Sequence, residues 1–142
     1  MKICMHNWMR PEPIEVTIKR LVKYGYDGIQ IMGEPRKYDL KEVKGLLDQN
    51  GIACQGAVSI MLAGRDLIHG DSYYRDMSVA YVKEVIDMIA YLGGSILTLV
   101  PSEVGKIVAM SDPIPNVDGQ LRGSRNVLRT LKKKGSLSDS NP

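Results

Sequence analysis

Tyr24-Gly25-Tyr26-Asp27-Gly28-Ile29-Gln30-Ile31-Met32-Gly33-Glu34 is the stretch that decides the fold. Gly25 stands where a helix commonly ends in a left-handed residue, a conformation that glycine adopts without a Cβ clash. Ile29 and Ile31 are β-branched and flank one polar residue, as in a strand that is covered on both faces. The chain then leaves the carboxylate of Glu34 at the carboxyl end of this strand, where parallel α/β folds collect their chemistry.

Similar strand–helix units precede and follow this stretch. Apolar spacing predicts helices over residues 13–23, 39–50 and 71–92, and strands over residues 2–6, 52–58 and 95–100. The first helix should bury a stripe of Ile14, Ile18, Leu21 and Val22, and Asp39 should cap the second. Alternating strands and helices with short connections imply parallel strands and right-handed crossovers. Four such strands and three helices make half of a (β/α)8 barrel, whose typical length is about 250 residues.

Composition restricts the class of protein. The chain has 142 residues, of which 44% are hydrophobic and 25% charged, as in a soluble globular domain. No run approaches the roughly 20 apolar residues of a membrane span, and the first residues do not form a secretory signal. Cys4 and Cys54 lie in apolar strand-like runs, so we expect reduced core thiols and a cytoplasmic location. No Gly-x-Gly-x-x-Gly follows the first strand, so nothing supports a dinucleotide fold.

The last part of the chain departs from this pattern. Residues 120–142 contain six basic side chains and one acidic one, with little apolar periodicity. We therefore expect residues 1–118 to form the half-barrel and residues 119–142 an irregular, disordered basic tail. A frameshift near Leu131 is one hypothesis, because another reading frame could encode a helix end, a strand and a Glu-Pro pair. The nucleotide sequence tests it, since a stop codon in that frame would exclude the idea.

Three parts of the chain carry a family resemblance: residues 24–34, 51–59 and 73–102. Gly25-Tyr26-Asp27-Gly28-Ile29, Gly51-Ile52, Tyr81-Val82-Lys83 and Leu92-Gly93-Gly94 are its motifs. On these motifs the chain resembles the N-terminal half of the sugar (phosphate) isomerase/epimerase family with the xylose isomerase-like TIM barrel, near the ketose 3-epimerases. The apurinic endonucleases share this barrel, but their zinc-binding histidines are missing at Ser59 and Ser102, which weakens a DNA-repair interpretation.

The resemblance implies metal-dependent carbohydrate chemistry in the full-length family. There a divalent Mn, Mg, Co or Zn ion, held by two glutamates, an aspartate and a histidine, polarises a sugar oxygen while carboxylates move a proton at the next carbon. Those ligands lie on the fifth to eighth strands, so none can be placed on this chain. We expect no metal ligand or catalytic residue here, no bound cofactor, and no activity in the chain as given.

Substrate contacts are expected instead at the strand exits: His6, Trp8, Glu34, Ser59 and Ser102. His6 would lie in the pocket wall, although a hydrogen-bonded structural histidine is equally consistent. Trp8 could stack on a sugar face or pack over the barrel mouth. Glu34 could accept sugar hydroxyls or be a solvated turn carboxylate. Ser59 and Ser102 are candidates by position alone.

The sequence leaves two alternative functions open. A non-enzymatic half-barrel could dimerise through its open sheet edges and bind a small molecule. A nucleic-acid-binding protein with a basic arm is the other, resting on Lys132-Lys133-Lys134, but no aromatic side chains are interleaved there. The sequence predicts neither a membrane partner nor a particular sugar.

Overall fold

A computed structural model describes residues 1–8, 10–62 and 64–103. The predicted tail, residues 119–142, and the frameshift hypothesis lie outside these residues. Two compact units are present, one of residues 1–59 and 85–98 and the other containing residues 60–84 and 99–103. No helix in the described ranges combines the length and hydropathy needed to cross a bilayer.

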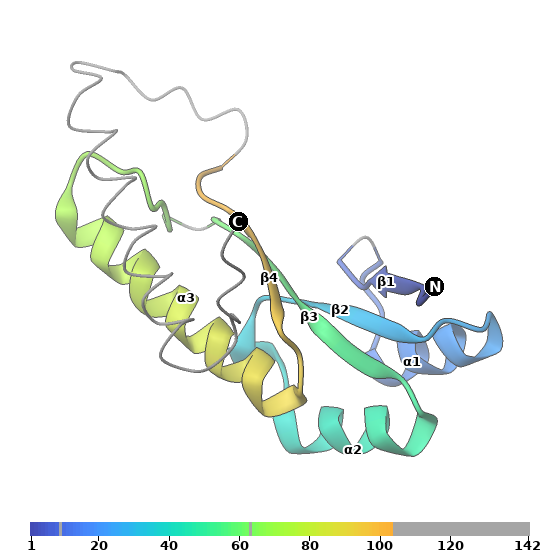
Figure 1. Cartoon of the computed structure of the whole chain (residues 1–142). Helices are drawn as coiled ribbons and strands as arrows, with labels where there is room; N and C mark the ends of the chain where they lie inside the picture. The colour runs from blue at the N-terminus through green and yellow to red at the C-terminus, as the bar shows by residue number, and fades with distance from the viewer. Residues whose placement is uncertain (9, 63, 104–142) are drawn as a thin grey trace, which may run out of the picture. The chain divides into compact units, whose positions relative to one another are not determined.

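The described elements alternate as predicted (Figure 1). They are β1 (Cys4–His6), α1 (Ile14–Lys23), β2 (Gly28–Met32), η1 (Pro35–Lys37), α2 (Leu40–Asn50), β3 (Ala53–Ile60), α3 (Ser72–Leu92) and β4 (Ile96–Val100). The strands form one sheet in the order β1-β2-β3-β4. β1 pairs with β2 and β2 with β3 in parallel, as expected for part of a (β/α)8 barrel.

Local chemistry explains where the helices begin and end. Gly25 follows α1 with φ 71°, and Gly51 ends α2 with φ 65°, both in the left-handed region that favours glycine. Asp39 caps α2 by accepting hydrogen bonds from the backbone N–H groups of Lys41 and Glu42 at 2.9 and 3.1 Å. The predicted glycine stops and the aspartate cap are therefore confirmed.

The core of the first unit lies between β2 and the helices. Ile29, Ile31, Ile18 and Leu21 are almost completely buried, and Figure 1 shows α1 and α2 on one side of β2 and β3. Val22, which we placed in the buried stripe, is 46% exposed. Thr17 is buried in its stead, because its hydroxyl donates to a Glu12 carboxylate oxygen at 2.9 Å and so satisfies its polar group.

The parallel pairing of β2 with β3 contains one irregularity in its register. Ile29 pairs with Cys54, but Gln30 pairs with Gly56, so Gln55 is an extra residue in β3. The N–H of Ser95, just before β4, donates to the Gln55 carbonyl at 3.0 Å. β4 lies against β3 at Gly56, where the Ile96 backbone fills the space that a side chain would occupy. Cys4 and Cys54 are both free thiols, but only Cys54 is a core residue, because Cys4 in the edge strand β1 is only partly buried.

Candidate functional site

The exit of β1 places two predicted site residues together. His6 is the last residue of β1 and lies opposite Gln30 of β2. The backbone N–H of Trp8 donates to His6 Nδ1 at 3.1 Å, and the two rings lie 6.4 Å apart between centroids. The hydrogen bond from the Trp8 backbone to the His6 ring closes a turn. This turn fixes the side chains of His6 and Trp8 at the carboxyl end of β1.

His6 is held as a neutral imidazole. Its Nδ1 also lies 3.3 Å from the Gln30 carbonyl oxygen, but a nitrogen that accepts from Trp8 N–H cannot donate at the same time. Desolvation lowers the pKa of His6 below 6.5, and the Gln30 carbonyl opposes this by favouring the protonated ring. The neutral ring therefore carries its proton on Nε2.

We expect the folded chain to be less stable in mild acid than at neutral pH, because the folded environment of His6 opposes its protonation. In the unfolded chain His6 takes up a proton near pH 6.5, whereas in the folded chain its pKa is lower. The stability contributed by neutral His6 is therefore present above about pH 6.5 and is lost as the pH falls toward the folded pKa. Melting curves at pH 7.5 and 5.5 should show a smaller acid-induced drop in Tm for His6→Gln than for wild type.

His69 supplies the control for this comparison, because it is the only other histidine in the chain. The His69→Gln variant should retain the wild-type drop in Tm. If His6→Gln showed the same acid-induced drop in Tm as wild type, the folded environment would not resist protonation of His6.

Asn7 is a strand-exit residue that the sequence did not single out. Its Oδ1 accepts the Met32 backbone N–H at 2.7 Å, and its Nδ2 donates to the Tyr38 hydroxyl at 3.2 Å. Its own N–H donates to the Gln30 carbonyl at 3.2 Å. Asn7 therefore joins the exits of β1 and β2 to the start of α2. A short amide directly after a strand was the only signal available for it.

Glu34 lies beside Tyr38 at the exit of β2. It precedes η1, and its carbonyl accepts the Lys37 N–H at 2.9 Å. Burial raises the pKa of Tyr38, the hydrogen bond from Asn7 partly offsets this, and the negative charge of Glu34 raises it further. Tyr38 is thus a neutral phenol next to a carboxylate.

The two predicted serines have different surroundings. Ser59 is completely buried in β3, where a Cβ added at Gly33 would lie 3.1 Å from its Cβ. Ser102 follows β4 in the second compact unit and is half-buried. The first unit therefore gathers His6, Trp8, Glu34 and Ser59 at the carboxyl ends of β1, β2 and β3, and their role as substrate ligands stays a prediction, as it does for Ser102.

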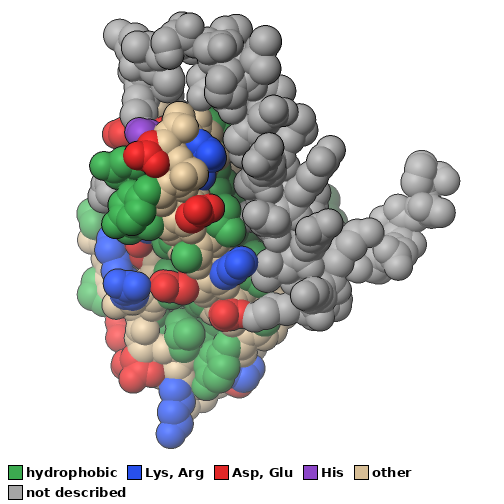
Figure 2. Space-filling model, turned by 90° about the vertical axis from the view of Figure 1, so that its left-hand side faces the viewer, with side chains coloured by type: hydrophobic (Ala, Val, Ile, Leu, Met, Phe, Trp, Pro, Cys, Tyr) green, Lys and Arg blue, Asp and Glu red, His purple; other side chains and the backbone are tan. Residues whose placement is uncertain are grey.

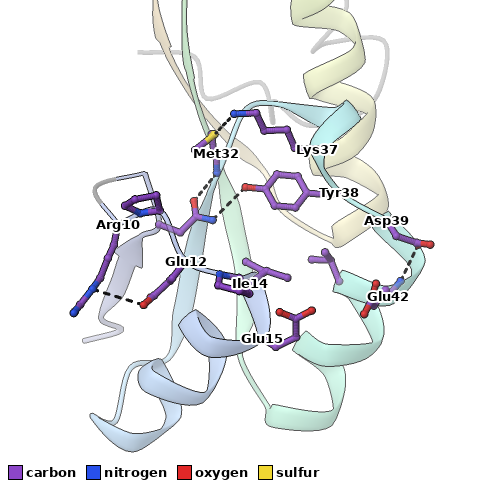
Figure 3. Close-up of a pocket in the computed structure, with 13 residues that line it drawn as sticks. Arg10, Glu12, Ile14, Glu15, Met32, Lys37, Tyr38, Asp39 and Glu42 are labelled. Atoms are coloured by element: carbon purple, nitrogen blue, oxygen red, sulfur yellow. Dashed lines mark hydrogen bonds and ion pairs between the residues drawn. The ribbon is translucent and has the colours of Figure 1, made fainter.

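A hollow of about 510 Å³ opens beside this edge of the sheet (Figure 3). It lies between the first turns of α1 and α2, with Asn7, Tyr38 and Met32 on one side. Figure 3 shows Glu15 and Glu42 extending from these two helices, and Arg10 paired with Glu12 at 3.7 Å. None of the five predicted substrate residues lines this hollow.

Side chains that could hold a metal ion are scattered in the described residues. Within residues 1–8, 10–62 and 64–103, no group of three or more His, Cys, Asp or Glu side chains is placed to hold an ion. The described residues therefore do not fit the metal that the family resemblance implies.

Together, the parallel β1-β2-β3-β4 order and the strand–helix alternation define the chain as part of a (β/α)8 barrel. The chain belongs to the family described as xylose isomerase-like TIM barrel, which it matches over residues 18–134. This match continues past residue 118 into the segment for which we expect an irregular tail. No curated protein matches the chain in sequence.

Solved structures with this fold include several epimerases. A D-allulose 3-epimerase from Methylomonas sp., in complex with D-allulose, superposes with TM-score 0.84 at 20% identity, covering 95% of this chain and 49% of that one. A D-psicose 3-epimerase from Clostridium cellulolyticum H10 gives 0.78 at 18%, with 95% and 50% covered. The 3-keto-D-glucoside 4-epimerase of E. coli gives 0.73 at 19%, with 95% and 53% covered. The chain thus spans about half the length of these structures, and at such identity the likeness concerns the fold.

Proposed function

We propose that this chain is the N-terminal half of a metal-dependent sugar or sugar-phosphate isomerase/epimerase and forms part of its substrate wall. The observation that carries this proposal is the position of His6 and Trp8, joined by a hydrogen bond at the carboxyl end of β1 in a parallel sheet. This end of the strands holds the active site in (β/α)8 enzymes. The epimerase names of the structural neighbours support a carbohydrate substrate.

Each wall residue has a definite chemical capacity. Neutral His6 donates from Nε2 without adding charge, Trp8 offers an apolar ring to a sugar face, and Glu34 accepts hydroxyl protons. These groups bind and orient a polyol. The metal that assists proton transfer in the family would need ligands that the described residues lack, so no chemical step is assigned to them. We place the wall in residues 1–118 and propose residues 119–142 as a separate tail.

Trp8 is the only tryptophan, so its fluorescence reports directly on the proposed wall. We expect D-allulose or D-fructose, titrated to about 100 mM, to change Trp8 emission in a saturable way, since typical KM values lie below about 1 mM. His6→Phe should abolish the saturable change, whereas His69→Phe should retain it. Emission that changes only linearly with sugar in the wild-type chain would refute the proposal.

Divalent metal should leave the chain's stability unchanged. Ligands that bind only the folded state raise Tm, but the described residues hold no suitable group of ligands. Thermal melts with and without Mn²⁺ or Mg²⁺ should therefore coincide. A metal-dependent rise in Tm would show that the chain builds an ion site of its own.

A second candidate is a non-enzymatic half-barrel that dimerises, and the backbone at the sheet edges favours it. At the two ends of β1 the Ile3 carbonyl accepts a hydrogen bond from the Asp27 N–H, and the Asn7 N–H donates to the Gln30 carbonyl. Because alternate residues of a strand direct their backbone groups to opposite sides, those of Cys4 and His6 are directed away from β2. Such an edge is a template for strand pairing. Size-exclusion chromatography should give a discrete dimer if this candidate holds. A folded monomer would contradict this candidate and favour the epimerase fragment.

The nucleic-acid candidate rests on residues outside the described ranges. Figure 2 shows charged side chains of both signs interspersed with hydrophobic ones on the face that it presents. The described residues on that face therefore form no basic stripe. Binding to nucleic acid that falls steeply with salt, and is lost on deleting residues 119–142, would be needed to support this function.

A further inference from the structure

A row of polar side chains crosses the sheet of the first unit. Gln30 in β2 donates from Nε2 to Thr98 Oγ1 in β4 at 3.1 Å, although 68 positions separate them in sequence. The strand between them is β3 (Figure 1), and its residue opposite Gln30 is Gly56. With no side chain at Gly56, the backbone of β4 approaches β3 closely at Ile96, and Thr98 comes within reach of the Gln30 amide.

His6 extends this row to β1. Residues paired across neighbouring strands share a face of the sheet, and His6 is paired with Gln30. The opposite face of β2 carries Ile29 and Ile31, which are completely buried next to the helices. Since successive side chains alternate between the two faces, Gln30 lies on the face away from the helices, which is the interior of a (β/α)8 barrel.

Each member of the row keeps at least one hydrogen-bonding group for which the described residues offer no partner. Among the described residues no partner is found for Gln30 Oε1, for the hydroxyl proton of Thr98 or for His6 Nε2. One acceptor therefore lies between two donors. All three side chains are at least partly exposed in the described part of the chain. Neighbouring sugar hydroxyls, each a donor and an acceptor, are complementary to such a set.

We propose that Gln30 and Thr98, together with His6, bind adjacent hydroxyl groups of the sugar and help select it. This inference rests on the proposed function and adds two residues to the substrate wall. The Gln30–Thr98 bond orients the amide so that Oε1, rather than Nε2, is directed to the ligand. A polyol lacking one of these hydroxyls would leave a polar group of the row unpaired, which disfavours it.

The test compares sugar binding by substituted chains. Gln30→Met keeps the length of the side chain and Thr98→Val keeps its shape, while each removes hydrogen bonds. D-fructose titrations followed by Trp8 fluorescence should give a dissociation constant raised about fivefold to tenfold by either change, as expected for loss of one hydrogen bond. Gln49→Met, an exposed glutamine on α2, is the matched control and should bind as wild type does.

A second measurement does not depend on whether the variants fold. In the wild-type chain, D-fructose should shift the side-chain NH₂ resonances of Gln30 and leave those of Gln49 unchanged. Saturable wild-type binding that Gln30→Met and Thr98→Val do not weaken would overturn this inference and leave the proposed function standing. A wild-type chain that binds no sugar would overturn both.

Discussion

Gly56→Ala should destabilise the chain by at least about 3 kcal/mol, the upper end of the usual cost of overpacking. A Cβ at this position would overlap the carbonyl oxygen of Ile96 and lie 2.7 Å from its carbonyl carbon. Both obstacles are backbone atoms, so no side-chain rotation can relieve the clash. β3 and β4 would have to separate, and the Gln30–Thr98 hydrogen bond would be broken with them. Urea unfolding of the purified variant measures the loss.

Gly45→Ala is the matched control for this change. Gly45 lies inside α2, and a Cβ added there meets no atom within 4 Å. Alanine should stabilise the helix by about 0.5 to 1 kcal/mol, because glycine loses more backbone entropy on folding. If Gly56→Ala unfolded at the wild-type urea concentration, the close approach of β4 to Gly56 would be disproved.

Leu21→Ala should cost about 3 kcal/mol, within the range for removing a fully buried leucine side chain. Leu21 has no exposed surface, so truncation leaves a cavity beneath α1. The neighbouring Val22 is 46% exposed and provides the comparison within the same helix. Val22→Ala should change stability by no more than about 0.5 kcal/mol.

Equilibrium urea unfolding of both variants decides this point. Their spacing in the sequence predicts one buried stripe for both residues, and only the structure distinguishes them. Equal losses for the two variants would mean that α1 packs on the sheet with a different face.

Periodicity and end signals predicted the helices well. Gly25 and Gly51 adopt the left-handed conformation that ended the predicted helices, and Asp39 caps α2. β1 is shorter than predicted, Cys4–His6 rather than residues 2–6. It is an edge strand whose pairs with β2 involve Cys4, Met5 and His6, and apolar residues alone do not specify how far pairing extends.

The candidate site was predicted only in outline. His6, Trp8 and Glu34 follow from the rule that parallel strands gather chemistry at their carboxyl ends. Gln30 and Thr98 could not be paired from sequence, because their contact depends on the bulge at Gln55, which aligns Gln30 with Gly56. A hydrogen bond between side chains on either side of a strand can be predicted only when the strand register is known. One extra residue, such as a bulge, changes that register.

We propose above all that the strand exits of β1 and β2 bind a sugar. The most direct measurement is the set of intermolecular nuclear Overhauser effects between D-allulose and the protein. We predict contacts from sugar protons to the rings of Trp8 and His6, with none to Ile14 in the neighbouring hollow. Contacts confined to Ile14 and Tyr38, or no contacts at all, would contradict sugar binding at these strand exits.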